Sequence, residues 1–309
     1  MIKGMVNMKE LNSKAKKNKI NFIIPDFLNV PECVYLLDTF RAHKEIYKDN
    51  IDIIGLHGMF VGHSWNIRDK KFEMYTMNYD LLNKIKAKYN NEYNISLFIT
   101  FDKEDIGIKD LEDEYSNKVM EIFNDKKNYV ICKSKRLADY IKETYKNVKV
   151  IVDFDENSVQ KNEYRLVKPE LNRSEIIKNY KNPENLILIP DGGFIPNRRN
   201  LFCHSKKELV IKTFNPKKDK YHSSKNGLSF IEMQQQNEYL TFDDLEEYSN
   251  FGINTFMFSG IGVYNIAMYM NYIDYIYKEE YKADACNNFL FRLVQMKEQE
   301  VKAIHNFEL

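Results

Sequence analysis

Short apolar runs recur along the chain, and each is bounded by proline, glycine or polar residues. Runs that are apolar throughout, without polar alternation, are typical of strands buried on both faces, as in a parallel sheet. The pattern predicts eight such strands: Asn21–Phe27, Ile51–Leu56, Ile95–Thr100, Tyr129–Cys132, Val148–Val152, Tyr164–Val167, Leu186–Ile189 and Asn254–Phe258.

The segments between the predicted strands have the apolar period of amphipathic helices. Two helix starts are clear, because Ser134 is placed to cap the following segment and Thr241 forms a capping-box pattern with Asp244. The predicted helices are Cys33–Tyr47, Leu81–Tyr89, Leu111–Phe123, Ser134–Tyr145, Ser174–Tyr180, one that begins at Thr241, and two at about Val263–Tyr281 and Ala283–His305.

Strands that alternate with helices form parallel βα units, and eight units predict a (β/α)8 TIM-type barrel. Because the strands are short, a doubly wound open sheet is the alternative. A polar stretch at about 190–240 follows the seventh strand, and it is too long for a loop without structure of its own. We therefore expect an insertion that contains strand or helix and covers the barrel mouth. Residues 1–20 form a polar lead-in, and 21–309 a single barrel domain with C-terminal helices.

Composition excludes several classes of function. The 46 Lys and Arg residues nearly balance the 45 Asp and Glu residues, so no overall field attracts nucleic acid or an acidic membrane surface. The sequence has no long apolar run and no apolar core behind its N-terminus, which predicts neither a transmembrane helix nor a signal peptide. Four dispersed cysteines without a Cys-x-x-Cys pair indicate reduced thiols and a cytoplasmic protein. The apolar C-terminal helices are either core or a homodimer surface.

The loop after the seventh strand is the first candidate site, because the carboxyl ends of parallel strands are where such folds bind ligands. Paired arginines bind carboxylate or phosphate, and a histidine titrates near neutrality. The alternative is a solvated loop with one buried cysteine. The catalytic candidates here are Asp191, Cys203 and His204, and the ligand-binding candidates are Arg198, Arg199 and Asn200.

A second group of polar residues follows the other strands. His57 comes directly after the second strand, with Trp65 and Asn66 as candidates to line a pocket, and Asp102 follows the third. His57 and His63, with Asp26, Asp102 or Asp153, are a weaker candidate for a metal site, and packing or hydrogen bonding is the alternative for these histidines. Trp65 alternatively closes the barrel mouth by packing.

The fourth and sixth strands add two more candidates. Glu170 at the mouth of the sixth strand is a candidate general base, with Asn172 as an orienting amide. Lys133 after the fourth strand is a candidate Schiff-base lysine or anion ligand, and a solvated side chain is the alternative. No glycine-rich dinucleotide motif and no nucleophile-elbow motif is present.

The order of several motifs resembles that of the U32-type TIM-barrel proteins, and most of all that of a bacterial branch of this group. The motifs are Gly58-Met-Phe-Val-Gly-His-Ser-Trp-Asn66, Ile99-Thr-Phe-Asp102, Asp113-Glu-Tyr-Ser-Asn117, Leu186-Ile-Leu-Ile-Pro-Asp191 with Pro196-Asn-Arg-Arg199, and Tyr239-Leu-Thr-Phe-Asp-Asp-Leu245 before Gly252-Ile-Asn-Thr-Phe-Met-Phe-Ser-Gly260. The group comprises collagenase-like peptidases and oxygen-independent hydroxylases of tRNA, rRNA and ubiquinone precursors.

The cysteines depart from the family pattern. The hydroxylases hold an iron–sulfur cluster with four cysteines, whereas this chain has Phe194, Ile195 and Arg198 in the corresponding loop and only Cys203 nearby. A cysteine-ligated cluster is therefore not expected, and the cofactor stays open. Three functions remain: an enzyme for a small or peptide-like anionic substrate at the barrel mouth, a catalytically inactive barrel that binds or scaffolds, and hydroxylation of a nucleic acid or aromatic precursor. The missing cysteines and the neutral charge disfavour the third.

Overall fold

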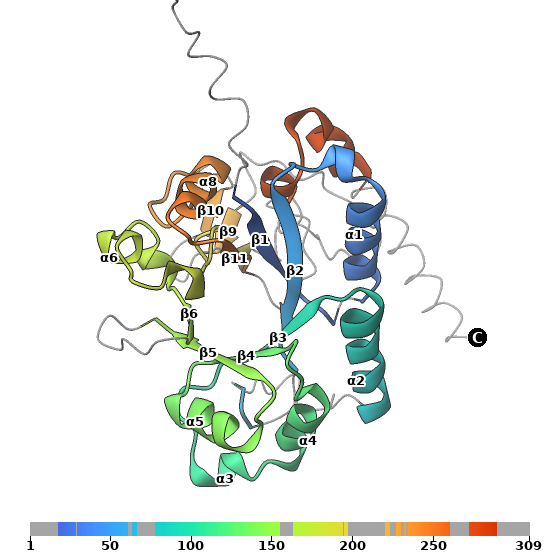
Figure 1. The fold of residues 1–309 in the computed structure, drawn as a ribbon, viewed down its shortest axis with the longest axis vertical. Helices are drawn as coiled ribbons and strands as arrows, with labels where there is room; N and C mark the ends of the chain where they lie inside the picture. Colours follow the sequence, from blue (N-terminus) through green and yellow to red (C-terminus); the bar gives the residue numbers. More distant parts are fainter. Residues whose placement is uncertain are drawn as a thin grey trace, which may run out of the picture.

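Eight parallel strands close into a barrel in the computed structural model, which describes residues 18–28, 30–60, 64–66, 78–154, 163–193, 195–196, 220–222, 227–229, 232, 234–259 and 272–288. The prediction of a TIM-type (β/α)8 barrel is confirmed, and the open sheet is excluded, because β1 pairs with both β2 and β11 (Figure 1). In ring order the strands are β1 (Ile20–Pro25), β2 (Ile51–Gly58), β3 (Ser96–Phe101), β4 (Tyr129–Cys132), β5 (Lys149–Asp153), β6 (Tyr164–Leu166), β7 (Leu186–Leu188) and β11 (Thr255–Met257).

Helices surround the barrel (Figure 1). Their starts follow the local sequence: the Ser134 hydroxyl accepts a hydrogen bond from the Leu137 amide, and Thr241 and Asp244 form the predicted capping box. Ser174 precedes its helix as predicted, but its side chain makes no capping bond. The described α-helices are α1 (Val30–Ala42), α2 (Tyr79–Lys86, continued by a π-helix at Ala87–Glu92), α3 (Ile108–Leu111), α4 (Glu114–Phe123), α5 (Lys135–Thr144), α6 (Glu175–Lys178) and α8 (Phe242–Asn250).

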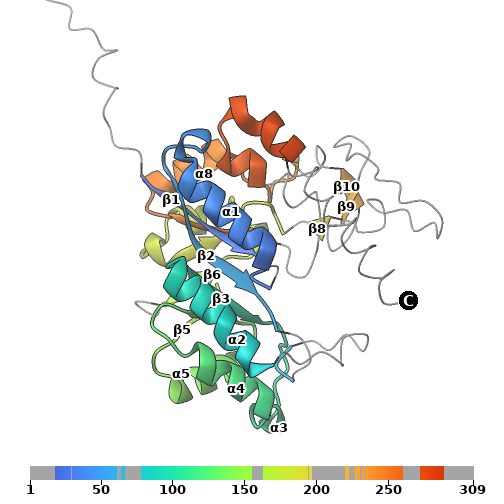
Figure 2. The same cartoon turned by 90° about the vertical axis from the view of Figure 1, so that its right-hand side faces the viewer.

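Shorter elements complete the described chain. Within the insertion, β8 (Ile195–Pro196), β9 (Lys220–His222) and β10 (Gly227–Ser229) form a small antiparallel sheet. This sheet lies on the side of the barrel toward which β2 points (Figure 2). Residues 272–276 and 282–288 are helical, and 3-10 turns occupy Lys44–Ile46, Pro169–Leu171, Pro183–Asn185 and Glu279–Tyr281.

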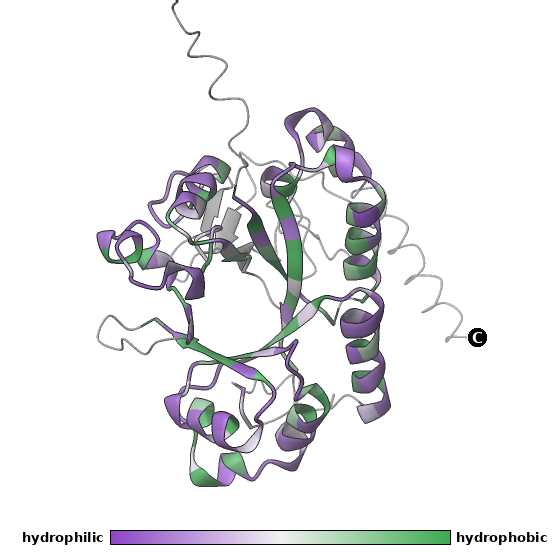
Figure 3. Ribbon diagram, viewed as in Figure 1, coloured by the Kyte–Doolittle hydropathy of each residue, from purple (hydrophilic) through white to green (hydrophobic). Residues whose placement is uncertain are grey.

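Two separate apolar clusters form the core. The larger one lies between the strands and the helices, and includes Leu36, Phe101, Val119 and Leu137. The smaller one fills the inside of the barrel with buried side chains from six of the eight strands, and Ile54 of β2 and Leu166 of β6 pack against it. The strands are accordingly apolar along most of their length, whereas the helices carry both kinds of residue (Figure 3). The inside of the barrel is therefore a packed core, and polar side chains can enter it only near its ends.

Gly55 leaves room for this inner cluster. A Cβ atom at Gly55 would lie 2.3 Å from Cε2 of Phe98, which is one of the inward side chains. Gly55→Ala should therefore lower the free energy of unfolding by about 1–3 kcal/mol, because the ring of Phe98 would have to move within a packed interior. Chemical denaturation measures the change. Gly107→Ala is the control, since its new methyl group meets no atom closer than 3.5 Å. An equal loss of stability in both variants would contradict the conclusion that Gly55 leaves room for the Phe98 ring.

Candidate functional site at the barrel mouth

The alternation of side chains along each strand defines which residues face the inside of the barrel at its carboxyl end. Phe98, Ile131, Ile151, Ile187 and Met257 point inward in the inner cluster, and Leu166 packs against it. Residues two positions further along point the same way. The ladder continues beyond the strand ends, since the Lys133 amide still donates to the Phe101 carbonyl. The inward positions at the mouth are therefore Thr100, Lys133, Asp153, Lys168, Ile189 and Ser259.

Asp153 stands between two lysines on three neighbouring strands. Its Oδ2 lies 4.0 Å from Nζ of Lys168, and the side chains of Asp153 and Lys168 are 35% and 62% exposed. Burial raises the pKa of Asp153 above its ordinary value, and the positive charges of Lys168 and Lys133 oppose that rise. The mouth over β4, β5 and β6 thus combines two cations with a carboxyl group whose proton is held more tightly than usual.

His57 replaces a hydrogen bond that a proline removes. In the β1–β11 ladder, the Asn21 amide donates to Asn254 and the Phe258 amide donates to Ile23, so the next acceptor in line is the Phe258 carbonyl and its donor would be residue 25. That residue is Pro25, which has no N–H. Nε2 of His57 lies 2.6 Å from the Phe258 oxygen and makes the bond instead.

This bond fixes the tautomer of His57. A carbonyl oxygen only accepts, so Nε2 carries the proton and Nδ1 is a bare acceptor. Burial lowers the pKa of His57 to about 4, against the opposing effect of the Phe258 bond, so the ring is neutral at pH 7. Nδ1 is buried, and no described residue donates to it; the hydroxyl oxygen of Thr100, on the next strand, is likewise buried without a partner.

Asp191 is only 2% exposed and holds the loop that follows β7. Its Oδ2 accepts from the Ser259 amide at 2.9 Å and the Ser259 hydroxyl at 2.8 Å, and its Oδ1 accepts from the Gly193 amide at 3.2 Å. Burial raises its pKa to about 6, and these bonds counteract the rise. The carboxyl group therefore ties the end of β7 to the end of β11.

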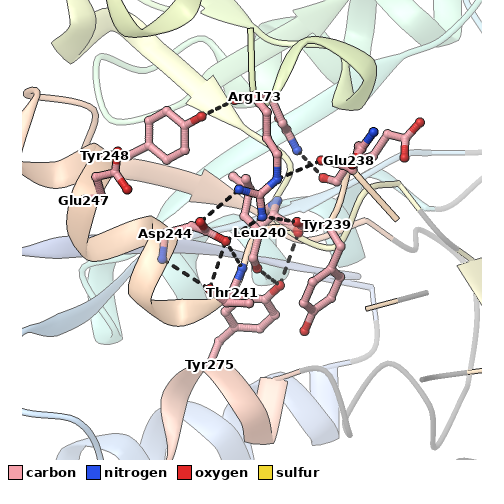
Figure 4. A network of polar contacts seen from close by, with 12 residues as sticks. Arg173, Glu238, Tyr239, Leu240, Thr241, Asp244, Glu247, Tyr248 and Tyr275 are labelled. Carbon is pink, nitrogen blue, oxygen red and sulfur yellow. Dashed lines mark hydrogen bonds and ion pairs between the residues drawn. The ribbon is translucent and has the colours of Figure 1, made fainter. Parts of the chain in front are cut away.

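The base of the insertion is held from both sides. Leu240 donates its amide to the Pro190 carbonyl, and Asp191 bridges to Tyr239. Arg173, which follows β6, binds Asp244 with both terminal nitrogens, at 3.0 and 2.7 Å, and also donates to the Tyr239 carbonyl (Figure 4). These contacts bring the chain back onto the barrel where α8 begins, so their role is structural.

The residues predicted around the second and third strands have packing roles. Trp65 has no exposed surface; its Nε1 donates to the Asp110 carbonyl, and its ring meets Phe101 and Tyr140 behind the sheet. Asn66 is buried, and its amide joins the Phe60 carbonyl to the backbone N–H of Asp102. Trp65 thus lies outside the barrel interior, in the layer between strands and helices.

Other predicted residues are exposed or lie beyond the described chain. Glu170 is exposed, on the 3-10 turn after β6, and the Asn172 amide donates to the Ile189 and Glu238 carbonyls. Among the described residues, no three His, Cys, Asp or Glu side chains come together as metal ligands would. Arg198, Arg199, Asn200, Cys203, His204 and His63 lie outside the described residues.

Sequence reasoning missed Lys168 and Thr100. Both stand two positions after an inward apolar residue, Leu166 and Phe98, so strand parity was the signal that could have found them. His57 makes the hydrogen bond that the backbone of Pro25 cannot make. This role depends on how β2, β1 and β11 pair, which a single sequence does not show.

Searches against family models, curated proteins and solved structures gave no match for this chain. In the part of the chain that the structure describes, no helix is both long and apolar enough to cross a membrane.

The raised pKa of Asp191 predicts a pH-dependent stability. The folded state holds this proton up to about pH 6, whereas the unfolded chain loses it near its ordinary value of 3.8. Protonated Asp191 therefore contributes stability that is present below pH 4 and lost as pH rises through 6, about 3 kcal/mol in all. Denaturation of the wild type and Asp191→Asn between pH 4.5 and 7 should show the difference shifting in favour of the variant. A difference that does not change with pH would contradict the burial of this carboxyl group.

Proposed function

We propose that this barrel is an enzyme that binds a small anionic substrate at its carboxyl-end mouth. The observation that carries the proposal is the placement of Lys133 and Lys168 on either side of Asp153. Two ammonium groups that flank the same carboxyl group favour a phosphate or carboxylate as ligand. The sequence suggested the same anion-binding role for Arg198 and Arg199, which lie outside the described residues.

Asp153 is the acid–base group of the proposal. A carboxyl group whose pKa is raised by burial is a better proton acceptor and donor near neutrality than an ordinary aspartate. Its position between the lysines places it beside the anionic group of the substrate, where proton transfer at an adjacent carbon or oxygen is feasible. The substrate class is a small anion, including peptide-like carboxylates. Membership of the U32-type group stays a prediction.

A catalytically inactive binding barrel is the second candidate. It is favoured by the structural bonds that occupy Asp191 and Asn66, two of the polar groups near the mouth. Asp153→Asn separates the two candidates. In an enzyme this variant should bind inorganic phosphate more tightly, because a competing negative charge is removed, yet lose about 10²–10⁴-fold in turnover of any phosphorylated or carboxylated substrate found by screening. In a binding barrel only the affinity changes.

The anion site is tested by binding of inorganic phosphate at low salt. Lys133→Ala and Lys168→Ala should each weaken binding by about 5–10-fold, since each removes a charge-assisted contact that is partly open to solvent. Isothermal titration calorimetry gives the dissociation constants. The matched control is Lys149→Ala, which removes an equal charge at the opposite end of the barrel, where Nζ lies 4.9 Å from the centroid of the Tyr129 ring.

The control decides between a local site and a general charge effect. Binding to Lys149→Ala should equal that of the wild type. If phosphate does not bind, or if all three variants lose affinity equally, the lysine pair is not the anion site.

A further inference from the structure

Two buried polar atoms on the neighbouring strands β2 and β3 have no hydrogen-bond partner among the described residues: Nδ1 of His57 and the hydroxyl oxygen of Thr100. Buried polar groups in folded proteins are nearly always hydrogen-bonded, because leaving one unpaired costs free energy. His57 is 1% exposed, so bulk solvent does not satisfy its nitrogen. Two such atoms on adjacent strands, at the ligand-binding end of a parallel barrel, are a reason to expect a group that completes them.

The backbone N–H that Pro25 lacks determines which kind of group can complete His57. Because His57 must donate through Nε2 to the Phe258 carbonyl, Nδ1 can only accept. An anion is therefore disfavoured at this point, since it would face a lone pair. The Thr100 hydroxyl both donates and accepts. A single hydroxyl group can satisfy both atoms, because it can donate to Nδ1 and accept from Thr100, whereas a group with a single N–H proton can satisfy only Nδ1.

The position relative to the lysines sets the ligand class. Strands two apart in a sheet are separated by roughly 10 Å, so the space between His57 on β2 and Lys133 after β4 is bridged by the two side chains and a small molecule. We infer that His57 and Thr100 form a second subsite, which binds a hydroxyl group of the same ligand whose anionic group the lysines hold. The ligand class is then a small hydroxylated anion, such as a phosphorylated polyol. This inference rests on the proposed function.

The test compares two phosphates that differ in their hydroxyl groups. Glycerol 3-phosphate carries hydroxyls, and n-propyl phosphate has the same carbon chain without them. Calorimetry on the wild type should show about tenfold tighter binding of glycerol 3-phosphate. ¹⁵N NMR of the histidine rings should assign the Nε2–H tautomer to His57, and its Nδ1 resonance should move with glycerol 3-phosphate but not with n-propyl phosphate.

Two variants locate the preference. His57→Gln places an amide nitrogen near the Nε2 position, so it keeps the donor to Phe258 and removes the Nδ1 acceptor. Thr100→Val removes only the hydroxyl and should leave the melting temperature unchanged or higher, because that hydroxyl has no described partner. Both variants should lose most of the preference for glycerol 3-phosphate while binding n-propyl phosphate like the wild type. If His57→Gln does not fold, Thr100→Val and the NMR shift on the wild type decide.

The outcomes separate the subsite from the anion site. Equal affinities for the two phosphates, with no effect of either variant, mean that a bound water alone completes the two atoms, and this overturns the subsite while leaving the lysine site standing. If neither phosphate binds, the proposed anion site fails and the hydroxyl subsite fails with it.

Discussion

Closing eight parallel strands into a ring forces their inward side chains into one shared interior, and the rest of the molecule follows from that constraint. In the middle of the barrel the shared space is filled by the inner apolar cluster. The Phe98 ring occupies the space that a side chain at position 55 would need, and that residue is glycine. His57, which pairs with Phe98, is a buried polar residue at the level of this layer, and the other polar inward positions at the mouth lie beyond it. At the carboxyl end they are Thr100, Lys133, Asp153, Lys168 and Ser259, contributed by strands that are distant in sequence.

The polar side chains on the two sides of the barrel mouth have different roles. On the side of β7, β11 and β1, polar groups are used to close the structure: Asp191 binds Ser259, and Nε2 of His57 replaces the amide that Pro25 lacks. The base of the insertion is fixed on the same side by Arg173 and its ion pair with Asp244 (Figure 4). On the side of β4, β5 and β6, Lys168 lies beside Asp153 near solvent, and the charge of Lys133 also acts on Asp153. A rigid half beside a solvent-facing charged half is an arrangement that supports ligand binding.

How much could be predicted depended on whether the information was local. The eight strands, their order and the caps at Ser134 and Thr241 were predicted correctly, because each arises from a short apolar run or a capping motif. Trp65 was expected to line a pocket or close the mouth, yet it packs behind the sheet, since nothing in its own loop says on which side of a strand the loop folds. The role of His57 depends on the pairing of β1 with both neighbours, including a register shift between Phe22 and Ile23. Such pairing is a property of several segments at once, and a single sequence does not display it.

The central claim is that the lysine pair at the mouth is where this protein binds an anion. Anomalous diffraction from a crystal soaked in selenate, at a concentration near the dissociation constant for phosphate, tests it most directly. The account predicts a selenium peak within hydrogen-bonding reach of Lys133 and Lys168. A competing site exists at the other end of the barrel, where an open groove is lined by Lys19, Lys48 and Lys278 together with Asp49, Asp243 and Glu246. Selenate bound there, with none at the mouth, would contradict the account.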